Sequence, residues 1–424
     1  MDFSTSVPFG QAVLPIISEI LLTLLLLLVL MLDLFLPESR RHGLGILAGV
    51  GAFAIVAVDL VVNWGLVTQE MYAKPDATLL GGMLQFDMLA LIFRTMILLA
   101  AGLTCLISTD VPKVGRQGEF YAIVLAATLG MTLMVSASDL IMVFLALETA
   151  SISLYILAGF LRDTKLSSEA GLKYYLFGAF TSGLMLYGLS LLFGFTGTTY
   201  LYGMPAALSG LLAEGAAGIF AVIMALLLVV VGFGFKIAAV PFHFWTPDVY
   251  QGAPTPVTAF VSTASKAASF ALLMRVFLIV WPVESQPYWV GLLAAMAVIT
   301  MTLGNLLALP QRNIKRLLAY SSIAQAGYTL MGVAALSDLG VAAVTFYMFM
   351  YVLTNIAAFT VVVVVSNATG TDEIKDFAGL FWRSPYLALA MVLALLSLGG
   401  IPPLAGFFGK FFLFSAAVQS GMVW

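Results

Sequence analysis

Charged residues are scarce in this chain of 424 residues. Aspartate, glutamate, lysine and arginine make up only 9% of it, whereas 62% is hydrophobic. Soluble domains carry about 25% charged residues. No water-soluble fold can bury so much apolar surface, so the composition excludes a soluble globular protein and indicates an integral membrane protein. The net charge of −3 and the lack of a basic run also argue against a nucleic-acid partner.

Cysteine and histidine are nearly absent as well. Cys105 is the only cysteine, so the chain can form neither an intrachain disulfide nor a Cys-ligated iron–sulfur cluster. The only histidines, His42 and His243, lie far apart and do not form a helix-borne pair of haem ligands. We therefore expect no redox cofactor in this chain. The N-terminus also lacks the basic start of a cleaved signal, so we expect the first apolar run to stay in the membrane.

Long apolar segments follow one another with short connections marked by glycine, proline and aspartate. A bilayer-spanning helix needs about 20 apolar residues, and these runs lack the alternation typical of barrel strands. The pattern predicts an all-α polytopic membrane protein with no inserted soluble domain. The twelve predicted helices cover residues 11–36, 43–65, 83–108, 119–136, 138–160, 168–197, 215–240, 255–279, 287–308, 316–337, 339–366 and 384–422.

Basic residues in the connections predict the orientation of the chain, because lysine and arginine accumulate in cytoplasmic loops. With the N-terminus outside, the outer loops hold only Lys74. The eleven basic residues of the inner loops are Arg40, Arg41, Lys113, Arg116, Arg162, Lys165, Arg312, Lys315, Arg316, Lys375 and Arg383. We therefore predict a multi-pass protein whose N-terminus lies on the outer side.

Four ionisable residues within the apolar segments are the main site candidates. Glu148 lies midway along the fifth segment, Lys236 near the end of the seventh, Lys266 at the centre of the eighth and Lys410 in the twelfth. A charge at the bilayer centre costs at least about 2.5–3.5 kcal/mol. Such residues persist when they are paired, hydrated or used, and we predict that these four are used.

The seventh and twelfth segments are both interrupted. Pro241 follows Lys236 by five residues, and Gly399-Gly400-Ile401-Pro402-Pro403 precedes Lys410. Broken helices at matching positions of two halves are typical of transporters. Because these two segments lie five apart, an odd number, a repeated five-helix unit would insert in the opposite sense. We predict an N-terminal three-helix segment over 1–115 and two inverted repeats over 116–280 and 281–424.

Buried lysines suit proton transfer for a simple chemical reason. A free lysine amine has a pKa near 10.4 and holds its proton firmly at neutral pH. Burial disfavours the charged form and a nearby carboxylate favours it, so a lysine with a movable carboxylate partner can load and release a proton. We predict that Glu148 and Lys236 form such a pair, that Lys266 continues a hydrated relay, and that Lys410 passes the proton to the far half. The alternative is a static ion pair or a lysine that snorkels to the interface.

Several other polar residues of the segments are weaker candidates. His243 either joins the relay or caps the second half of the broken helix, and Lys173 is a further relay candidate. Asp87 and Arg94 lie seven residues apart on one helix face, so we expect them to fix structure. We expect Arg275 to anchor its helix at the membrane interface.

Longer motifs give the chain a family resemblance. Over nearly its whole length it resembles the antiporter-like subunits of proton-pumping NADH:quinone oxidoreductase, respiratory complex I. Within that family, a lysine at position 410 is similar to the N and L types, and FWTPDVY at 244–250 is similar to the N type. The resemblance rests on VPFHFWTPDVY at 240–250, GAPTPV at 252–257, KRLLAYSSI at 315–323, LGGIPP at 398–403 and GFFGK at 406–410.

This resemblance implies fourteen helices, with helices four to eight and nine to thirteen as inverted repeats and helices seven and twelve discontinuous. It also implies a proton half-channel built on Glu148, Lys236 and Lys266, and an exit half-channel with Lys410. The twelve visible helices lead us to expect a chain shortened relative to its relatives, with an incomplete second repeat.

The family also implies the setting of this subunit. Flavin, iron–sulfur clusters and the quinone site are expected in other subunits, and quinone chemistry there would drive this one. The implied partners are a neighbouring antiporter-like subunit, small membrane subunits and lipids, in a bacterial cytoplasmic or equivalent energy-coupling membrane. Two alternatives stay open, a subunit of a multi-subunit sodium/proton antiporter and a passive membrane scaffold.

Overall fold

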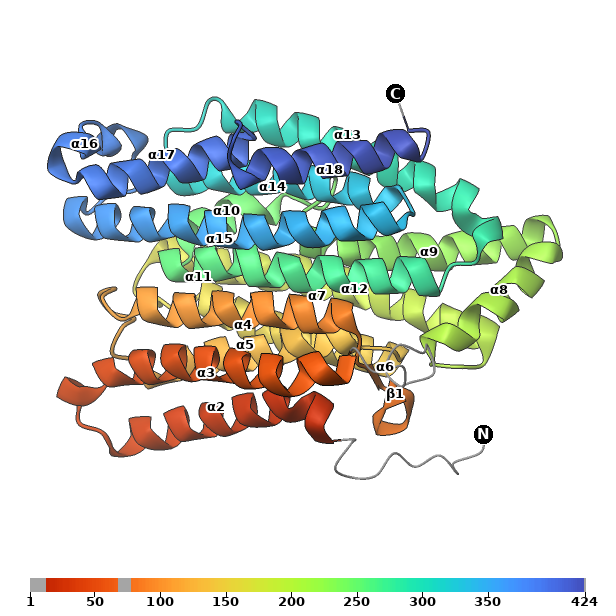
Figure 1. Ribbon diagram of the computed structural model, residues 1–424, viewed down its shortest axis with the longest axis horizontal. Coiled ribbons are helices and arrows are strands. Elements are labelled where there is room, and N and C mark those ends of the chain that lie inside the picture. The colour runs from red at the N-terminus through yellow and green to blue at the C-terminus, as the bar shows by residue number, and fades with distance from the viewer. Residues whose placement is uncertain (1–12, 68–77, 423–424) are drawn as a thin grey trace.

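The computed structural model describes residues 13–67 and 78–422, and nearly all of this part is helical. Long helices lie side by side in one bundle, with the N-terminal helices at one edge and the C-terminal helices at the opposite edge (Figure 1). Within the described ranges, ten helices are long and apolar enough to cross a membrane. The predicted all-α polytopic membrane fold is therefore confirmed.

The N-terminal half contains the first six predicted segments. A short 3-10 turn, η1 (Leu14–Ile16), leads into the first of them, and a two-stranded hairpin precedes α4. The long helices are α2 (Ile17–Phe35), α3 (His42–Val67), α4 (Met88–Ser108), α5 (Gly118–Ser136), α6 (Leu140–Ala158) and α7 (Lys165–Thr196). The hairpin pairs β1 (Thr78–Leu79) with β2 (Leu84–Gln85), and the other 3-10 turns here are η2 (Glu38–Arg40) and η3 (Leu80–Gly82).

The C-terminal half contains the other six segments, two of them broken. A short helix, α8, precedes them and was not predicted. The helices are α8 (Met204–Ala213), α9 (Ala216–Ile237), α10 (Trp245–Gly252), α11 (Thr255–Phe260), α12 (Lys266–Ile279), α13 (Gln286–Ala308), α14 (Ile314–Ala334), α15 (Asp338–Thr369), α16 (Leu380–Arg383), α17 (Pro385–Gly399) and α18 (Ala405–Gln419). The shorter turns are η4 (Leu201–Gly203), the π-helical η5 (Val261–Ser265), η6 (Val283–Ser285) and η7 (Ile374–Phe377).

Polar side chains just before the helices fix several of their starts. The carboxylate of Asp87 accepts a hydrogen bond from the Ala90 amide at 2.8 Å and begins α4, and Asp139 begins α6 in the same way. The side chain of Asn313 accepts from two amides of the first turn of α14. These caps satisfy amides that have no partner within the helix. The starts of these three helices are therefore set by local sequence.

The seventh segment is broken as predicted. Helix α9 ends at Ile237, Ala238 takes a left-handed conformation, and α10 begins only at Trp245. Two backbone groups freed by the break find side-chain partners. The Val240 amide donates to Thr300 Oγ1 at 3.0 Å, and the Trp245 indole donates to the Phe235 carbonyl at 3.1 Å. Such compensation is what allows an interruption inside a membrane protein.

The twelfth segment is also broken, between α17 and α18. Gly400 takes a positive φ of 82° after the last residue of α17, and residues 401–404 separate the two half-helices. The helical segments agree with the predicted ones to within a few residues. The division into two inverted repeats stays a prediction, as do the boundaries at 115 and 280. Lys74 and residues 11–12 of the first predicted segment lie outside the described residues.

Candidate functional site

Glu148 and Lys236 lie near each other without forming a direct ion pair. Glu148 is half-buried on α6 and accepts a hydrogen bond from Ser182 of α7 at 2.7 Å. Lys236, in the last turn of α9, is only 6% exposed and donates to the hydroxyl of Ser151, which lies on α6. Glu148 lies one helical turn before Ser151 on α6, so its carboxylate is on the same side of this helix as the Lys236 contact. Serine hydroxyls therefore contact both groups of the predicted pair.

The ring of Tyr155 forms one wall of this group. It lies on α6, and its centroid is 5.5 Å from Lys236 Nζ, within range of a cation–π contact. Tyr174 of α7 packs edge-on against the same ring at 4.8 Å. Gly178 of α7 is in close contact with this ring, because an added Cβ would lie 2.5 Å from Tyr155 Cζ. The glycine thus makes room for the aromatic ring beside the lysine.

Lys266 is central in a continuous helix and is only 2% exposed. The π-helical turn η5 immediately precedes it, and such turns are frequent at functional sites. Its Nζ donates to the main-chain carbonyl of Ser322, on α14, at 2.6 Å. Lys266 therefore binds a main-chain carbonyl of the tenth predicted segment.

A network of buried hydroxyls surrounds the Lys266 contact. Ser322 Oγ accepts from the Tyr351 hydroxyl at 2.8 Å and lies 3.2 Å from the hydroxyl of Tyr250. Asn355 donates to Tyr351 at 2.7 Å and to Ser262, in the π-helical turn, at 3.2 Å. These residues come from α10, η5, α14 and α15. One hydrogen-bonded group thus joins α10 and η5, which lie in the first predicted repeat, to α14 and α15, which lie in the second.

Lys410 lies on α18, just after the second break. Its Nζ donates to the Leu398 carbonyl at 2.9 Å, one of the carbonyls at the end of α17. Gln325 of α14 donates to the same carbonyl at 3.0 Å and accepts from the Tyr347 hydroxyl. The ring of Tyr328 lies 4.4 Å from the amine. The broken helix therefore supplies backbone acceptors that an intact helix would use internally.

Helix α14 connects the second and third lysines. Ser322, Gln325 and Tyr328 are spaced three residues apart, so they lie along one face of this helix. Ser322 contacts Lys266, whereas Gln325 and Tyr328 contact the surroundings of Lys410. The surroundings of Lys266, which precedes α14 in the sequence, and of Lys410, which follows it, therefore meet at this one helix.

The two relay candidates lie in different surroundings. His243 is buried in the break, and its Nδ1 has no hydrogen-bond partner among the described residues. The residue before α10 is Phe244, and no side chain caps that helix, so the prediction that His243 caps it is wrong. Lys173 is bound in a partly exposed ionic group, 2.7 Å from Glu169 and 2.6 Å from Asp248. A relay role for either residue stays a prediction.

Arg275 has partners that the sequence analysis did not predict. It is 3% exposed, and its guanidinium donates to the Val135 carbonyl, to Gln85 and to Asp87. It is therefore a buried ion-pair partner of Asp87, and anchoring of its helix at the membrane interface stays a prediction. Nothing in the local sequence indicates this contact, because the two residues are 188 positions apart.

Several polar residues of the site were missed. They are neutral groups around Glu148 and the site lysines, and their chemistry is unremarkable in the sequence, because serine and tyrosine are common in membrane helices. Gln325 and Asn355 carry the available signal, an amide in the middle of an apolar segment. The missed residues are Ser151, Ser182, Tyr250, Ser322, Gln325, Tyr347, Tyr351 and Asn355.

Comparisons with known proteins agree with this architecture. Residues 137–424 match a family model described as the transmembrane region of NADH:quinone oxidoreductase and Mrp antiporters. NADH-quinone oxidoreductase subunit N of Moorella thermoacetica is 46% identical over 409 residues, which cover 96% of this chain and 82% of that protein.

Solved structures give the same result. A chain of respiratory complex I from Thermus thermophilus, solved with bound aureothin, is 36% identical with a TM-score of 0.77 and covers 95% of this chain and 83% of that chain. A chain of the Mrp complex from Dietzia sp. DQ12-45-1b is 23% identical with a TM-score of 0.77, covering 97% and 76%, and shows a shared fold alone. Since the likeness at 46% identity, over 96% of this chain, is to an N subunit, the chain belongs to the family of antiporter-like N subunits of NADH:quinone oxidoreductase.

Proposed function

We propose that this chain is a non-redox, proton-translocating subunit of the membrane arm of NADH:quinone oxidoreductase, and that Glu148, Lys236, Lys266 and Lys410 move the protons. Quinone reduction in other subunits would supply the energy. Flavin, iron–sulfur clusters and the quinone site would belong to those subunits. The membership in the N-subunit family supports the role of the whole subunit. The assignment to particular residues rests on the geometry described above.

One observation carries the proposal, which is that the three site lysines bind neutral acceptors. Lys236 donates to a serine hydroxyl, and Lys266 and Lys410 donate to main-chain carbonyls. Among the described residues, no carboxylate oxygen lies within 4 Å of these three amines, whereas the partly exposed Lys173 has two carboxylate partners. A buried lysine held directly by a carboxylate stays charged, while one held by neutral groups can give up its proton.

The contacts suggest an order for the groups. Ser182 contacts Glu148, which lies one turn from the Lys236 acceptor on α6. The α10 residue Tyr250 reaches the Lys266 network through Ser322. Along α15, Tyr351 contacts that network, and Tyr347 one turn earlier contacts Gln325 beside Lys410. We propose that protons pass between these groups through water held by the hydroxyls. The route runs across the bundle, from the first predicted repeat to the second.

Alanine substitutions of the three lysines test the proposal in membranes that contain the assembled complex. We expect Lys236→Ala, Lys266→Ala and Lys410→Ala to leave assembly intact and to reduce NADH:quinone turnover and proton translocation together. Lys375→Ala is the matched control, since Lys375 is exposed in η7. Normal turnover and flux with lowered abundance of the complex would instead support a scaffold role and refute the proposal.

The sodium/proton antiporter alternative is less well supported. The likeness to the Mrp chain is at 23% identity, whereas the N subunits reach 46%. The two functions differ in their need for NADH. We expect inverted membranes with the complex to build a proton gradient only with NADH and quinone, and a sodium gradient alone to drive none. We also propose an outer N-terminus and a neighbouring antiporter-like subunit as partner.

A further inference from the structure

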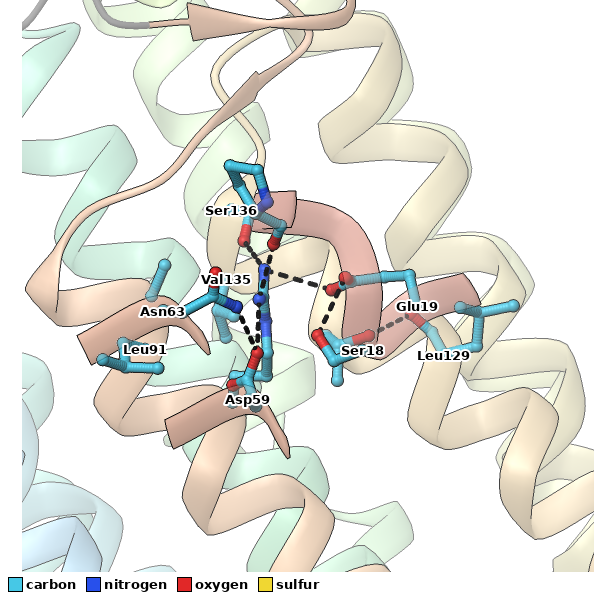
Figure 2. Close-up of polar contacts among 12 residues, drawn as sticks. Ser18, Glu19, Asp59, Asn63, Leu91, Leu129, Val135 and Ser136 are labelled. Atoms are coloured by element: carbon cyan, nitrogen blue, oxygen red, sulfur yellow. Dashed lines mark hydrogen bonds and ion pairs between the residues drawn. The ribbon is translucent and has the colours of Figure 1, made fainter. Parts of the chain in front are cut away.

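The first three long helices hold a buried charged cluster apart from the site lysines (Figure 2). We call Glu19 of α2, Asp59 of α3 and Arg94 of α4 the N-terminal cluster. Their exposed fractions are 7%, 0% and 1%. The guanidinium of Arg94 lies 3.2 Å from Glu19 Oε1 and 3.1 Å from Asp59 Oδ1, between the two carboxylates. Ser18, Asn63 and Ser136 complete the polar surroundings (Figure 2).

The two carboxylates contact Arg94 in different ways. Asp59 Oδ1 accepts from Arg94 Nη1 at 3.1 Å and from Asn63 Nδ2 at 2.7 Å. Glu19 Oε1 lies 3.2 Å from Arg94 Nη2 but accepts no hydrogen bond, and Glu19 Oε2 accepts from Ser18 at 3.0 Å. The remaining Arg94 bonds go to the Pro15 carbonyl and to the Ser136 hydroxyl. Among the described residues, each carboxylate thus keeps one buried oxygen without a hydrogen bond, Glu19 Oε1 and Asp59 Oδ2. Asp59 accepts two hydrogen bonds and Glu19 only one, so Asp59 is the better bonded counterion.

The cluster does not balance in charge if both acids are ionised. Two carboxylates and one guanidinium leave one negative charge, and an uncompensated charge in a low-dielectric interior is strongly unfavourable. No other cation compensates it among the described residues, because Arg275 of α12 is engaged by Asp87. On α5, which packs against α2, α3 and α4, the titratable Glu119 and Tyr121 lie at the opposite end from Ser136.

We propose that the N-terminal cluster is a proton-binding site of this subunit and that Glu19 carries the proton. With Glu19 neutral, Asp59 and Arg94 form one balanced pair. The Ser18 hydroxyl fits both states, because it can donate to a carboxylate and accept from a carboxylic acid. Glu19 is also the most exposed member of the cluster, so it has the shortest path for exchange of the proton.

The site is connected to the rest of the bundle through the end of α5. Arg94 binds Ser136, and Arg275 binds the carbonyl of the preceding residue, Val135. Arg275 belongs to α12, the helix that also carries Lys266. Arg94 of α4 and Arg275 of α12 therefore bind the same turn of α5. A change of charge at Glu19 acts on Arg94 and, through this turn, on the contact with α12. This inference does not depend on the lysine pathway.

Infrared spectroscopy of the purified complex tests the proposal. A protonated carboxylic acid has a carbonyl band separate from that of a carboxylate, and the band shifts in D₂O. We expect Glu19→Gln to assemble and to lose one such band, while the control Glu38→Gln, at an exposed acid in η2, keeps it. A Glu19→Gln spectrum unchanged in this region would overturn the proposal. So would failure of this variant to assemble, because glutamine reproduces the neutral acid.

Variants of Asp59 make the charge argument sharper. In Asp59→Asn, Glu19 becomes the only counterion of Arg94, so we expect it to lose its proton, the band to disappear and the complex still to assemble. The double variant Glu19→Gln/Asp59→Asn leaves Arg94 unpaired, and we expect loss of the assembled complex. A fully assembled double variant, or an Asp59→Asn variant that keeps the band, would contradict a shared single proton.

Discussion

Substitution of Gly178 tests whether the Tyr155 ring positions the first lysine of the site. An alanine Cβ at 178 would lie 2.5 Å from Tyr155 Cζ. Carbon atoms in contact prefer about 3.5–4.0 Å, so the ring must move by about 1 Å. It cannot move freely, because it is 93% buried and packs against Tyr174 on one side. Lys236 Nζ lies 5.5 Å from the same ring.

The expected magnitude follows from two opposing effects. Overpacking of a well-packed core costs about 1–3 kcal/mol. Alanine in place of glycine in a helix returns about 1 kcal/mol. Gly183 is on the same helix, one turn and a half further on, and an added Cβ there would have no neighbour within 4 Å. Gly183→Ala therefore raises helix stability without a steric clash. The free energies of unfolding of the two variants should differ by about 1–3 kcal/mol.

The assay compares heat inactivation and NADH:quinone turnover of the two assembled variants. We expect Gly178→Ala to inactivate at a lower temperature than Gly183→Ala and to turn over more slowly, since the displaced ring disturbs the surroundings of Lys236. In a Tyr155→Ala background, Gly178→Ala should have no further destabilising effect. Equal stability and equal turnover of Gly178→Ala and Gly183→Ala would refute this reasoning.

Three further predictions concern contacts at the site and at the N-terminal helices. Ser151→Ala removes the hydroxyl that accepts the hydrogen bond of Lys236, and a hydrogen bond of a charged group is worth about 1.5–3 kcal/mol. NADH:quinone turnover should therefore fall. The control Ser153→Ala should keep wild-type turnover, because the Ser153 hydroxyl bonds its own helix. Asp87→Asn keeps the side-chain oxygen that caps α4 but removes the negative charge beside Arg275. The assembled complex should lose up to about 3 kcal/mol of stability, measured by heat inactivation. Wild-type heat stability would contradict this expectation. Gly400→Ala, with φ of 82° and a Cβ 3.0 Å from the α18 lysine, should lower turnover more than Gly379→Ala, which has a positive φ but no close neighbour.

The membrane helices and their breaks were predictable because they depend on local properties. An apolar run long enough to span a bilayer predicts a helix wherever it occurs. Pro241 and the Pro402-Pro403 pair cannot continue a helix, so both breaks fall where the sequence places them. The short helix α8 escaped prediction, because ten residues between two spans give no spanning signal.

The contacts of the site were less predictable because they join distant segments. The positions of the buried lysines could be read from the sequence, but their partners could not. Ser151 is 85 residues from Lys236, and Ser322 is 56 residues from Lys266. The ion pair of Arg275 was missed for the same reason, since only the fold brings Asp87 to it. A charged residue in an apolar run is identifiable from the sequence as a site candidate, whereas the residue that it contacts depends on how the helices pack.

Helix α14 shows how packing and function are linked in this bundle. By length and composition it is not among the helices that would cross a membrane alone. It packs against α10, α13, α15 and α18, and these neighbours shield its polar face from lipid. Two of its polar groups, Ser322 and Gln325, contact the Lys266 and Lys410 surroundings. Because the neighbouring helices surround these groups, α14 can carry polar contacts between two lysines without exposing them to lipid.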